Sequence, residues 1–402
     1  MKILQICNKF PYPPKDGGVI ATYNMLKGFY ITGHAVTIAT INTSKHYTDK
    51  ASLPFEIGQM ANYYDVYKYT NPHVFGALWN LLFSYKPYTA TRFMSKKFKK
   101  VLDEIFISNT FDIIQIEGLY MCQYIPYIRK YSNAPIAYRA HNIEFEIWDR
   151  LWRKTKNPIK KAYFFSVARR VARFEKSHIN TYDILVPITQ RDLNKYKELG
   201  NTKPSFVAPT GVFVKDYQSK PFSGDISLFH IGGLDWAPNQ YGLLWFIKNC
   251  WEDIRKLHPN ISFKIAGRNA PKWFVKKMSA PGVEFVGEVE SSRDFMTNHA
   301  IMVVPLLAGG GMRIKIIEGL AYGKVIVSTS VGAEGISAQH EKEIYIANTA
   351  EQFVAGITEL INNSELFRSI EKNAITFVHQ TYDNNKIIQE LIDFYQQHVP
   401  RD

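Results

Sequence analysis

The chain has 402 residues, which is long for one domain and sufficient for two domains with a hydrophobic core each. Its composition, with 46% hydrophobic and 21% charged residues, is that of a globular protein, and no long apolar run indicates a membrane span. The amino terminus is more typical of a strand than of a signal peptide, and the three cysteines match no metal-binding or redox spacing. We therefore expect a cytoplasmic protein with reduced thiols.

The net charge of +13 is concentrated in the first half of the chain. Residues 86–100 hold six basic residues and no acid, and residues 150–176 hold ten basic residues against Glu175 alone. Both clusters contain aromatic residues, namely Phe93, Phe98, Trp152, Tyr163, Phe164 and Phe165. This combination favours an anionic membrane surface at the inner face over nucleic acid, because no nucleic-acid-binding motif accompanies the charge. A solvated basic helix face is the alternative interpretation.

Short apolar runs alternate with longer amphipathic segments along the whole chain, which is typical of parallel sheets connected by helices. In the first half the expected strands are residues 3–6, 35–40, 113–116, 136–138, 184–187 and 205–207. Residues 43–100 are irregular and aromatic, and we expect them to influence the choice of acceptor. The segment 216–225 has many turn formers and no apolar periodicity, so it predicts a linker between two domains.

After this linker the alternation of strands and helices begins again. The expected strands are residues 228–231, 262–266, 284–286, 301–304 and 325–328, and the expected helices are residues 240–257, 291–298, 312–322 and 351–362. We predict an α/β fold of two doubly wound Rossmann-like domains, residues 1–215 and 226–380, facing each other across a cleft where the strands end. A last helix, at about 384–398, is expected to pack back on the first domain.

The glycine-rich segment 308–324, with the sequence AGGGMRIKIIEGLAYGK, joins a predicted strand to a predicted helix. The glycines allow close approach of a ligand, and the positive end of the helix dipole favours an anion. Lys315 and Glu318 are three residues apart and share a helix face, whereas Ile314, Ile317 and Ala321 can pack on the other side. A cation for phosphate and a carboxylate for paired hydroxyls indicate a nucleotide-sugar site.

A second cluster of polar residues, the segment Arg139-Ala-His-Asn-Ile-Glu144, follows a predicted strand in the first half. His141 is at the carboxyl end of this strand, where ligands bind in open α/β sheets. A histidine in this position is a candidate for chemistry, with a purely structural histidine as the alternative.

These segments together resemble the retaining glycosyltransferase family 4, which has the two-domain GT-B fold, over essentially the whole chain. Further segments that carry the resemblance are PYPPKDGG at 11–18, PTGV at 209–212, HIGGLDWAPN at 230–239, IAGRN at 265–269, VEFVGE at 283–288 and VGAEG at 331–335. The resemblance implies that His141 lies beside the transferred sugar and that Glu318 holds the ribose hydroxyls. These two are our catalytic candidates, and Arg139, Asn142 and Glu144 are expected to support His141.

The resemblance also implies a set of donor-binding residues: Gly17, Gly18, Gly233, Arg268, Gly287, Gly309, Gly310, Gly311, Met312, Arg313, Lys315 and Glu318. The first of two glutamates in the usual family pattern would fall at Gly310, so this carboxylate is missing. The basic residues that many relatives have soon after the 230–239 turn are also missing. The chain resembles a subgroup in which backbone amides, Arg313 and Lys315 serve the sugar diphosphate.

The function implied by this resemblance is a retaining glycosyltransferase that moves a sugar from a UDP- or GDP-linked donor to a glycan or lipid-linked acceptor in surface polysaccharide or glycoconjugate synthesis. We expect no cofactor and no metal ion, since Arg313, Lys315 and the helix dipole can stabilise the departing diphosphate. The alternatives are a catalytically silent scaffold on the same fold, favoured by Gly310, and a nucleotide-sugar epimerase or phosphorylase. The expected location is the cytoplasm, at the inner membrane face.

Overall fold

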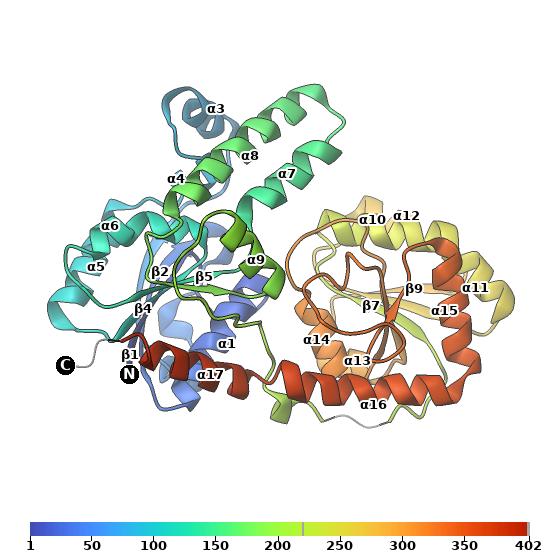
Figure 1. The fold of residues 1–402 in the computed structure, drawn as a ribbon. Helices are drawn as coiled ribbons and strands as arrows, with labels where there is room; N and C mark the ends of the chain where they lie inside the picture. Colours follow the sequence, from blue (N-terminus) through green and yellow to red (C-terminus); the bar gives the residue numbers. More distant parts are fainter. Residues whose placement is uncertain (219–220, 400–402) are drawn as a thin grey trace. The chain divides into compact units, whose positions relative to one another are not determined.

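The computed structural model describes residues 1–218 and 221–399, which form two compact units (Figure 1). The first unit comprises Met1–Thr210 and the segment from Asn385 onward, and the second comprises Gly211–Asn384. Each unit contains a six-stranded sheet in which every pair is parallel. The predicted fold class, an α/β protein with two Rossmann-like domains, is confirmed.

The sheet of the first unit has the order β3-β2-β1-β4-β5-β6. Its strands are β1 (Lys2–Cys7), β2 (Ala35–Thr43), β3 (Asn62–Lys68), β4 (Ile113–Glu117), β5 (Ile136–Ala140) and β6 (Ile184–Pro187). The central strands are buried on both faces, because alternate residues enter two different hydrophobic cores. Leu4 and Ile114 pack in one core, and Ile3 and Ile113 pack in the other.

The helices of the first unit connect these strands and cover both faces of the sheet. They are α1 (Gly17–Ile31), α2 (Phe55–Gly58), α3 (Val74–Phe83), α4 (Tyr88–Thr91), α5 (Lys96–Ser108), α6 (Ile125–Ile128), α7 (Glu144–Lys154), α8 (Pro158–His178) and α9 (Gln190–Glu198). The C-terminal helix α17 (Asn384–Gln396) also belongs here and lies beside the N-terminal elements (Figure 1). Its residues Ile388, Leu391 and Tyr395 are buried in the core that contains Ile3.

Two expectations for the first half were wrong. Residues 205–207 form no strand: Ser205 makes an isolated bridge with Leu185, and the ladder stops because Pro187 has no N–H to donate. The segment 43–100, which looked irregular, contains β3 and the helices α2 to α5. β3 is an edge strand with polar residues among its tyrosines, so its apolar alternation is weak.

The sheet of the second unit has the order β12-β11-β10-β7-β8-β9. Its strands are β7 (Leu228–Ile231), β8 (Phe263–Ala266), β9 (Val283–Gly287), β10 (Ile301–Val304), β11 (Val325–Ser328) and β12 (Tyr345–Ile346). Its helices are α10 (Ala237–Phe246), α11 (Glu252–Leu257), α12 (Lys272–Lys277), α13 (Ser292–Thr297), α14 (Ile314–Ala321), α15 (Ala350–Asn362) and α16 (Ser364–Thr381). Helices α14 and α15 both pack against β11. A short π-helical stretch separates α10 from α11, where one helix was predicted.

The boundary between the units lies between Thr210 and Gly211, earlier than the predicted end of the first domain at residue 215. Val212 forms a parallel bridge with Asp383, and its backbone N–H donates to the carbonyl oxygen of Tyr382 at 2.9 Å. These contacts attach the segment to the second unit. Residues 219 and 220 of the predicted linker lie outside the described residues.

Candidate functional site

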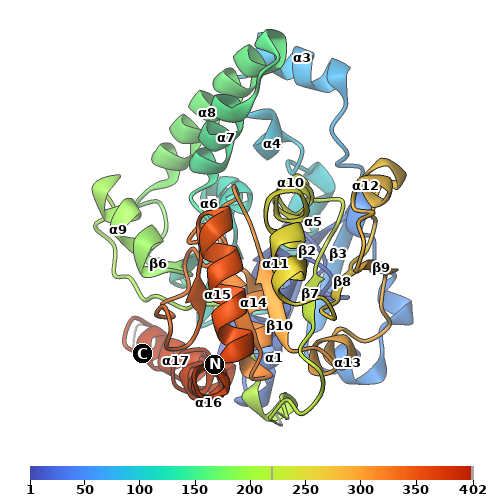
Figure 2. The same cartoon turned by 90° about the vertical axis from the view of Figure 1, so that its right-hand side faces the viewer.

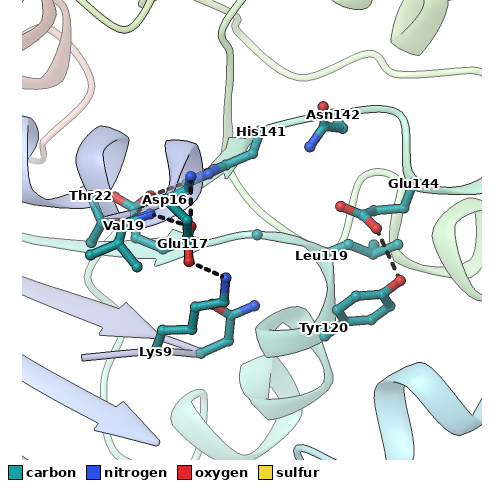
Figure 3. A pocket seen from close by; sticks show the side chains of 13 residues that line it. Lys9, Asp16, Val19, Thr22, Glu117, Leu119, Tyr120, His141, Asn142 and Glu144 are labelled. Carbon is teal, nitrogen blue, oxygen red and sulfur yellow. Dashed lines mark hydrogen bonds and ion pairs between the residues drawn. The ribbon is translucent and has the colours of Figure 1, made fainter. Parts of the chain in front are cut away.

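A pocket of about 230 Å³ opens in the first unit where β1, β4 and β5 end and α1 begins (Figure 3). Its position follows from the parallel sheet, because the carboxyl ends of parallel strands meet at one edge. The lining residues are Asn8, Lys9, Asp16, Gly18, Val19, Thr22, Glu117, Gly118, Leu119, Tyr120, His141, Asn142 and Glu144. Four predicted site residues, Gly18, His141, Asn142 and Glu144, are therefore in one pocket.

Glu117, the last residue of β4, has a buried carboxylate with four partners. Its Oε1 accepts hydrogen bonds from Nε2 of Gln5 at 2.7 Å and from Nε2 of Gln115 at 2.5 Å. Its Oε2 lies 2.5 Å from Nε2 of His141 and 3.3 Å from Nη1 of Arg139. Burial opposes ionisation, but the Arg139 guanidinium and His141 outweigh it and lower the pKa of Glu117 to about 2. Glu117 is therefore an anion at neutral pH.

The charge of Glu117 determines how His141 is held. A carboxylate can only accept hydrogen bonds, so Nε2 of His141 carries the proton in this contact. In the neutral ring Nδ1 then has the lone pair, and it lies on the side of Gly18, where an added Cβ would be 3.9 Å away. The imidazole is thus oriented by a buried anion on one side and presents the other nitrogen at the pocket.

Asp16 is the N-cap residue of α1, and its side chain accepts hydrogen bonds from the first backbone amides of this helix. Its Oδ1 accepts hydrogen bonds from the backbone N–H groups of Gly18 and Val19, both at 3.1 Å, and its Oδ2 accepts from Nζ of Lys9 at 3.0 Å. Burial would raise the pKa of Asp16, but Lys9 and these hydrogen bonds hold it below its usual value. The resemblance implied that Gly18 binds the donor, but its backbone N–H already donates to Asp16 within the chain.

Two other predicted residues of the segment 139–144 lie behind the pocket or at its edge. Arg139 is completely buried and pairs with Glu117 rather than lining the pocket. Glu144 lines the pocket, accepts a hydrogen bond from the Tyr120 hydroxyl at 2.9 Å, and has a pKa raised by burial. Its backbone N–H donates to the buried carboxylate of Glu175, which caps the start of α7.

In the second unit, the glycine loop after β10 closes around Arg313. Gly309 and Gly311 have positive φ values of 137° and 77°, which favour glycine. A Cβ on Gly309 would lie 2.3 Å from Nη2 of Arg313 and 3.0 Å from the Trp236 ring. The Arg313 guanidinium donates to the carbonyl oxygens of Gly310 and Gly311 and is 5.0 Å from the Trp236 ring centroid. Arg313, expected to serve the diphosphate, holds its own loop in this structure.

Lys315 lies at the first turn of α14, facing the turn after β7. Its Nζ donates to Oδ1 of Asn239 and to Nε2 of His230, both at 3.2 Å. Burial, followed by the charge of Arg313, lowers the pKa of Lys315 to about 7. A Cβ on Gly232 would lie 3.2 Å from Nζ of Lys315, so the glycine leaves room for the ammonium group. The cation is thus poised between its charged and neutral forms near pH 7.

His230, the acceptor for Lys315, is completely buried in β7. Its Nδ1 is 2.8 Å from the carbonyl oxygen of Val303 and donates to it, which leaves the lone pair of Nε2 for Lys315. Burial and the charge of Lys315 hold the pKa of His230 well below its ordinary value. The histidine is therefore neutral and fixes the position of the lysine.

Glu318 lies one turn further along α14. Glu318 is partly buried, the loss of water around its carboxyl raises its pKa to about 7, and its Oε1 accepts a hydrogen bond from the Tyr217 hydroxyl at 3.5 Å. The Tyr217 ring also packs on Tyr322, with ring centroids 4.6 Å apart. Ile317 and Ala321 are buried on the other side of the helix, as the spacing predicted. Lys315 and Glu318 thus lie on one side of α14.

Three further turns of the second unit are in contact through their backbones. The N–H of Gly267 donates to the carbonyl oxygen of Gly287 at 2.7 Å, and the N–H of Leu234 donates to that of Arg268 at 2.9 Å. The carbonyl of Gly233 accepts from the Asn239 side chain at 2.8 Å. The predicted residues Gly233, Arg268 and Gly287 are therefore brought together, whereas Met312 is largely buried.

Sequence reasoning missed several residues of these sites. Glu117 had a usable signal, because the strand residues 113–117, IIQIE, end in a carboxylate just as the next strand leads to His141. His230, Trp236 and Asn239 were within a recognised segment without an assigned role. Tyr217 had no signal, since it lies in the segment predicted to be a linker. In the described parts of the chain, no group of three or more His, Cys, Asp or Glu side chains is arranged to hold a metal ion.

The comparisons with known proteins agree with this architecture. Residues 225–363, most of the second unit, match the family model of the glycosyl transferases group 1. The chain is 25% identical to an uncharacterized 44.6 kDa protein in the cps region of Klebsiella pneumoniae, over 97% of this chain and 98% of that protein. No helix within residues 1–218 and 221–399 is long and apolar enough to cross a membrane.

Solved structures that resemble nearly the whole chain include the following two. HepE from Anabaena, crystallised in complex with UDP, has a TM-score of 0.69 and 14% identity, covering 99% of this chain and all of HepE. Sucrose-phosphate synthase from Thermosynechococcus elongatus has a TM-score of 0.74 and 12% identity, covering 99% of both chains. At these identities the likeness establishes the fold, which is GT-B. The family match and the fold together support a glycosyltransferase.

Proposed function

We propose that this protein transfers a sugar from a nucleoside diphosphate sugar to a glycan or lipid-linked acceptor, with retention at the anomeric carbon, in surface polysaccharide synthesis. The observation that carries the proposal is the pair Lys315 and Glu318 on one side of α14, within the region that matches the glycosyl transferases group 1. UDP is the first candidate for the donor nucleotide, because HepE was crystallised with it. The name of the Klebsiella relative motivates the polysaccharide context.

In this proposal Lys315 binds the diphosphate. Its ammonium lies 3.2 Å from Asn239 and from the neutral His230, and it has a third N–H to offer an anion. A bound diphosphate would favour the charged form of Lys315 and raise its pKa from about 7. The same contact would stabilise the negative charge that develops on the leaving group as the glycosidic bond breaks. Glu318, once ionised, would accept hydrogen bonds from the ribose hydroxyls.

In the first unit, His141 is proposed to contact a hydroxyl of the reacting sugar through Nδ1, while Glu117 holds its Nε2. The pocket volume of about 230 Å³ is sufficient for part of a sugar, and its polar lining of Asp16, Asn142 and Glu144 suits hydroxyl groups. With a neutral ring, Nδ1 would accept a hydrogen bond from the sugar. Loss of turnover on His141→Ala, with nucleotide binding intact, would support this assignment.

Calorimetric titration of UDP and GDP against the wild type, Glu318→Ala and Glu365→Ala tests the donor site, first without and then with magnesium. Glu365 is an exposed carboxylate on α16 of the same unit and provides the matched control. We expect one nucleotide to bind, with about tenfold weaker binding to Glu318→Ala and an unchanged affinity for Glu365→Ala. Failure of both nucleotides to bind would favour the silent scaffold.

A second measurement separates an enzyme from a protein that binds nucleotide sugars without transfer. Donor hydrolysis and transfer to a panel of acceptors are followed by nuclear magnetic resonance, which also reports the anomeric configuration of the product. A product with the configuration of the donor supports retention, and an inverted product contradicts it. A nucleotide sugar that changes configuration without loss of the diphosphate would indicate the epimerase alternative.

A further inference from the structure

Helix α3 presents its apolar side to solvent. Its exposed side chains include Phe75, Trp79 and Leu82, at 84%, 68% and 74% exposure, and it contains no charged residue. The residues of its inner side are Gly76, Ala77, Asn80 and Leu81, of which Asn80 is the most buried. This is the reverse of an ordinary surface helix, whose apolar stripe faces the core. The complete outward set is Val74, Phe75, Leu78, Trp79, Leu82 and Phe83.

Polar contacts on the inner side hold α3 in this orientation. The guanidinium of Arg170, from α8, donates to the carbonyl oxygens of Asn80, Leu81 and Ser84 at 3.1, 2.6 and 2.7 Å, and so caps the end of α3. The Asn80 side chain donates to the Thr91 hydroxyl at 3.3 Å. Figures 1 and 2 both show α3 next to α8, at the end of the first unit where α7 and α8 project. The hydrogen bonds of Arg170 and Asn80 therefore fix α3 with its apolar side toward solvent.

The surroundings of α3 are basic. Residues 150–176, which span the end of α7 and nearly all of α8, hold ten basic residues, and their one acid, Glu175, is buried. Arg169 and Arg173, on the same helix as the anchoring Arg170, are exposed. Lys86, in the turn after α3, is also exposed. An exposed apolar helix beside many cations complements a surface that is apolar inside and anionic outside.

We propose that α3 inserts its outward side into the interfacial layer of an anionic phospholipid bilayer, while the basic residues of α8 contact the headgroups. A second copy of the chain is a poorer occupant, because pairing two α3 helices would bring two basic surfaces together. The inference goes beyond the proposed sugar transfer, which does not require a membrane. The inference assigns the apolar contact to α3. It gives the basic cluster of residues 86–100 no role in insertion.

The test is co-sedimentation of the full chain with phosphatidylcholine vesicles, with and without phosphatidylglycerol. We expect binding only to the anionic vesicles and partial loss in high salt. The double variant Phe75→Ser/Trp79→Ser is expected to bind about tenfold more weakly, because two large apolar side chains no longer leave water. Phe55→Ser is the matched control, since Phe55 is 77% exposed on α2 of the same unit, and its binding should equal that of the wild type.

Fluorescence gives a second measurement. Trp79 emission should shift to shorter wavelength with anionic vesicles, and this change should vanish in Trp79→Phe while vesicle binding remains. No sedimentation with anionic vesicles, or sedimentation that Phe75→Ser/Trp79→Ser leaves unchanged, would overturn the proposal. A dimer in analytical ultracentrifugation that Trp79→Ser dissociates, without vesicle binding, would assign the surface to a second copy. Nucleotide affinity, measured on the same variants, reports separately on the proposed sugar transfer.

Discussion

Nε2 of His141 lies 2.5 Å from Oε2 of Glu117, and this contact joins the ends of β5 and β4 at the pocket of the first unit. Three further donors, from Gln5, Gln115 and Arg139, fix the carboxylate in place. A histidine oriented by a buried, fully hydrogen-bonded anion keeps one tautomer and one ring position. Glu117 is thus the positioning residue for the proposed contact of His141 with sugar.

The substitution Glu117→Gln should both destabilise the first unit and release His141. It leaves the buried Arg139 without its anion, which typically costs about 3–5 kcal/mol of unfolding free energy. Urea unfolding measures this loss, and 15N chemical shifts of the imidazole measure the tautomer. The wild type should show a proton on Nε2, and the variant a mixture. Glu104→Gln, on the exposed side of α5, should change neither.

The same pair predicts an acid dependence of stability. The pKa of Glu117 is about 2 in the folded chain against about 4.5 for an ordinary glutamate, so its contribution to stability is complete above about pH 4.5 and is lost as pH falls through 2. The advantage of the wild type over Glu117→Gln should therefore shrink steadily below pH 4.5. A difference in stability that stays constant over this range would show that the ion pair is not its source.

Adjacent glycines at the start of α1 should respond differently to alanine. A Cβ on Gly18 would enter the pocket, 3.4 Å from Oδ1 of Asp16 and 3.9 Å from Nδ1 of His141, whereas a Cβ on Gly17 meets nothing within 4 Å. Gly18→Ala should lower turnover, by about tenfold, with unchanged melting temperature. Gly17→Ala should resemble the wild type in both assays. Equal activity of the two variants would argue against sugar binding beside His141.

Nucleotide affinity should pass through a maximum near pH 7. Lys315, with a pKa of about 7, loses its charge as pH rises, which weakens diphosphate binding. Glu318, also with a pKa of about 7, becomes protonated as pH falls, which weakens its acceptance of ribose hydroxyls. Affinity should fall by up to about tenfold per pH unit on each side.

Two variants separate the limbs of this profile. Glu318→Gln should remove the acid limb, because its amide oxygen accepts hydrogen bonds at every pH, and Lys315→Met should remove the alkaline limb and weaken binding overall. The titration of the nucleotide itself is common to all variants and cancels in the comparison. Calorimetry in two buffers of different ionisation enthalpy should also reveal proton uptake on binding above pH 7. If the acid limb persists in Glu318→Gln, or the alkaline limb persists in Lys315→Met, that limb is caused by the titration of another group.

Gly267 should be intolerant of any side chain. A Cβ there would lie 2.0 Å from the carbonyl oxygen of Gly232, the residue whose own lack of a side chain leaves room for Lys315. Gly267→Ala should therefore cost stability at the upper end of about 1–3 kcal/mol and weaken nucleotide binding by moving the turn after β7. Thermal unfolding and calorimetry check both effects. Gly58→Ala, which meets nothing within 4 Å, should be neutral.

The parts of the fold that were predicted are those with strong local patterns. β7, β10 and β11 were predicted to the residue, because both faces of these strands are buried and their sequences are apolar apart from His230 and Ser328. β3 and β12 were missed, since both are edge strands, one with many polar residues and the other with only two residues. The helix predicted over residues 240–257 is present, but the π-helical turn between α10 and α11 has no local sequence signal.

The site was predicted where spacing along one helix was enough. Lys315 and Glu318 share a side of α14 because residues three apart do so in any helix. The partners of these residues could not be predicted, because His230 and Tyr217 are 85 and 101 positions away in the chain. The Arg313 side chain turns back onto its own loop because of the positive φ of Gly309 and the position of the Trp236 ring. Only the folded loop brings these features together.

The position of α17 has a consequence for synthesis of the chain. The core around Ile3 is incomplete until Ile388, Leu391 and Tyr395 have left the ribosome, although β1 is the first element made. The Tyr395 hydroxyl donates to Gln115 at 2.7 Å, and Gln115 in turn donates to Glu117, so the pocket also waits for this helix. The second unit, Gly211–Asn384, is already complete at that point. The unit that begins first therefore finishes last, and a nascent chain that stops short of α17 has its second unit but not the His141 pocket.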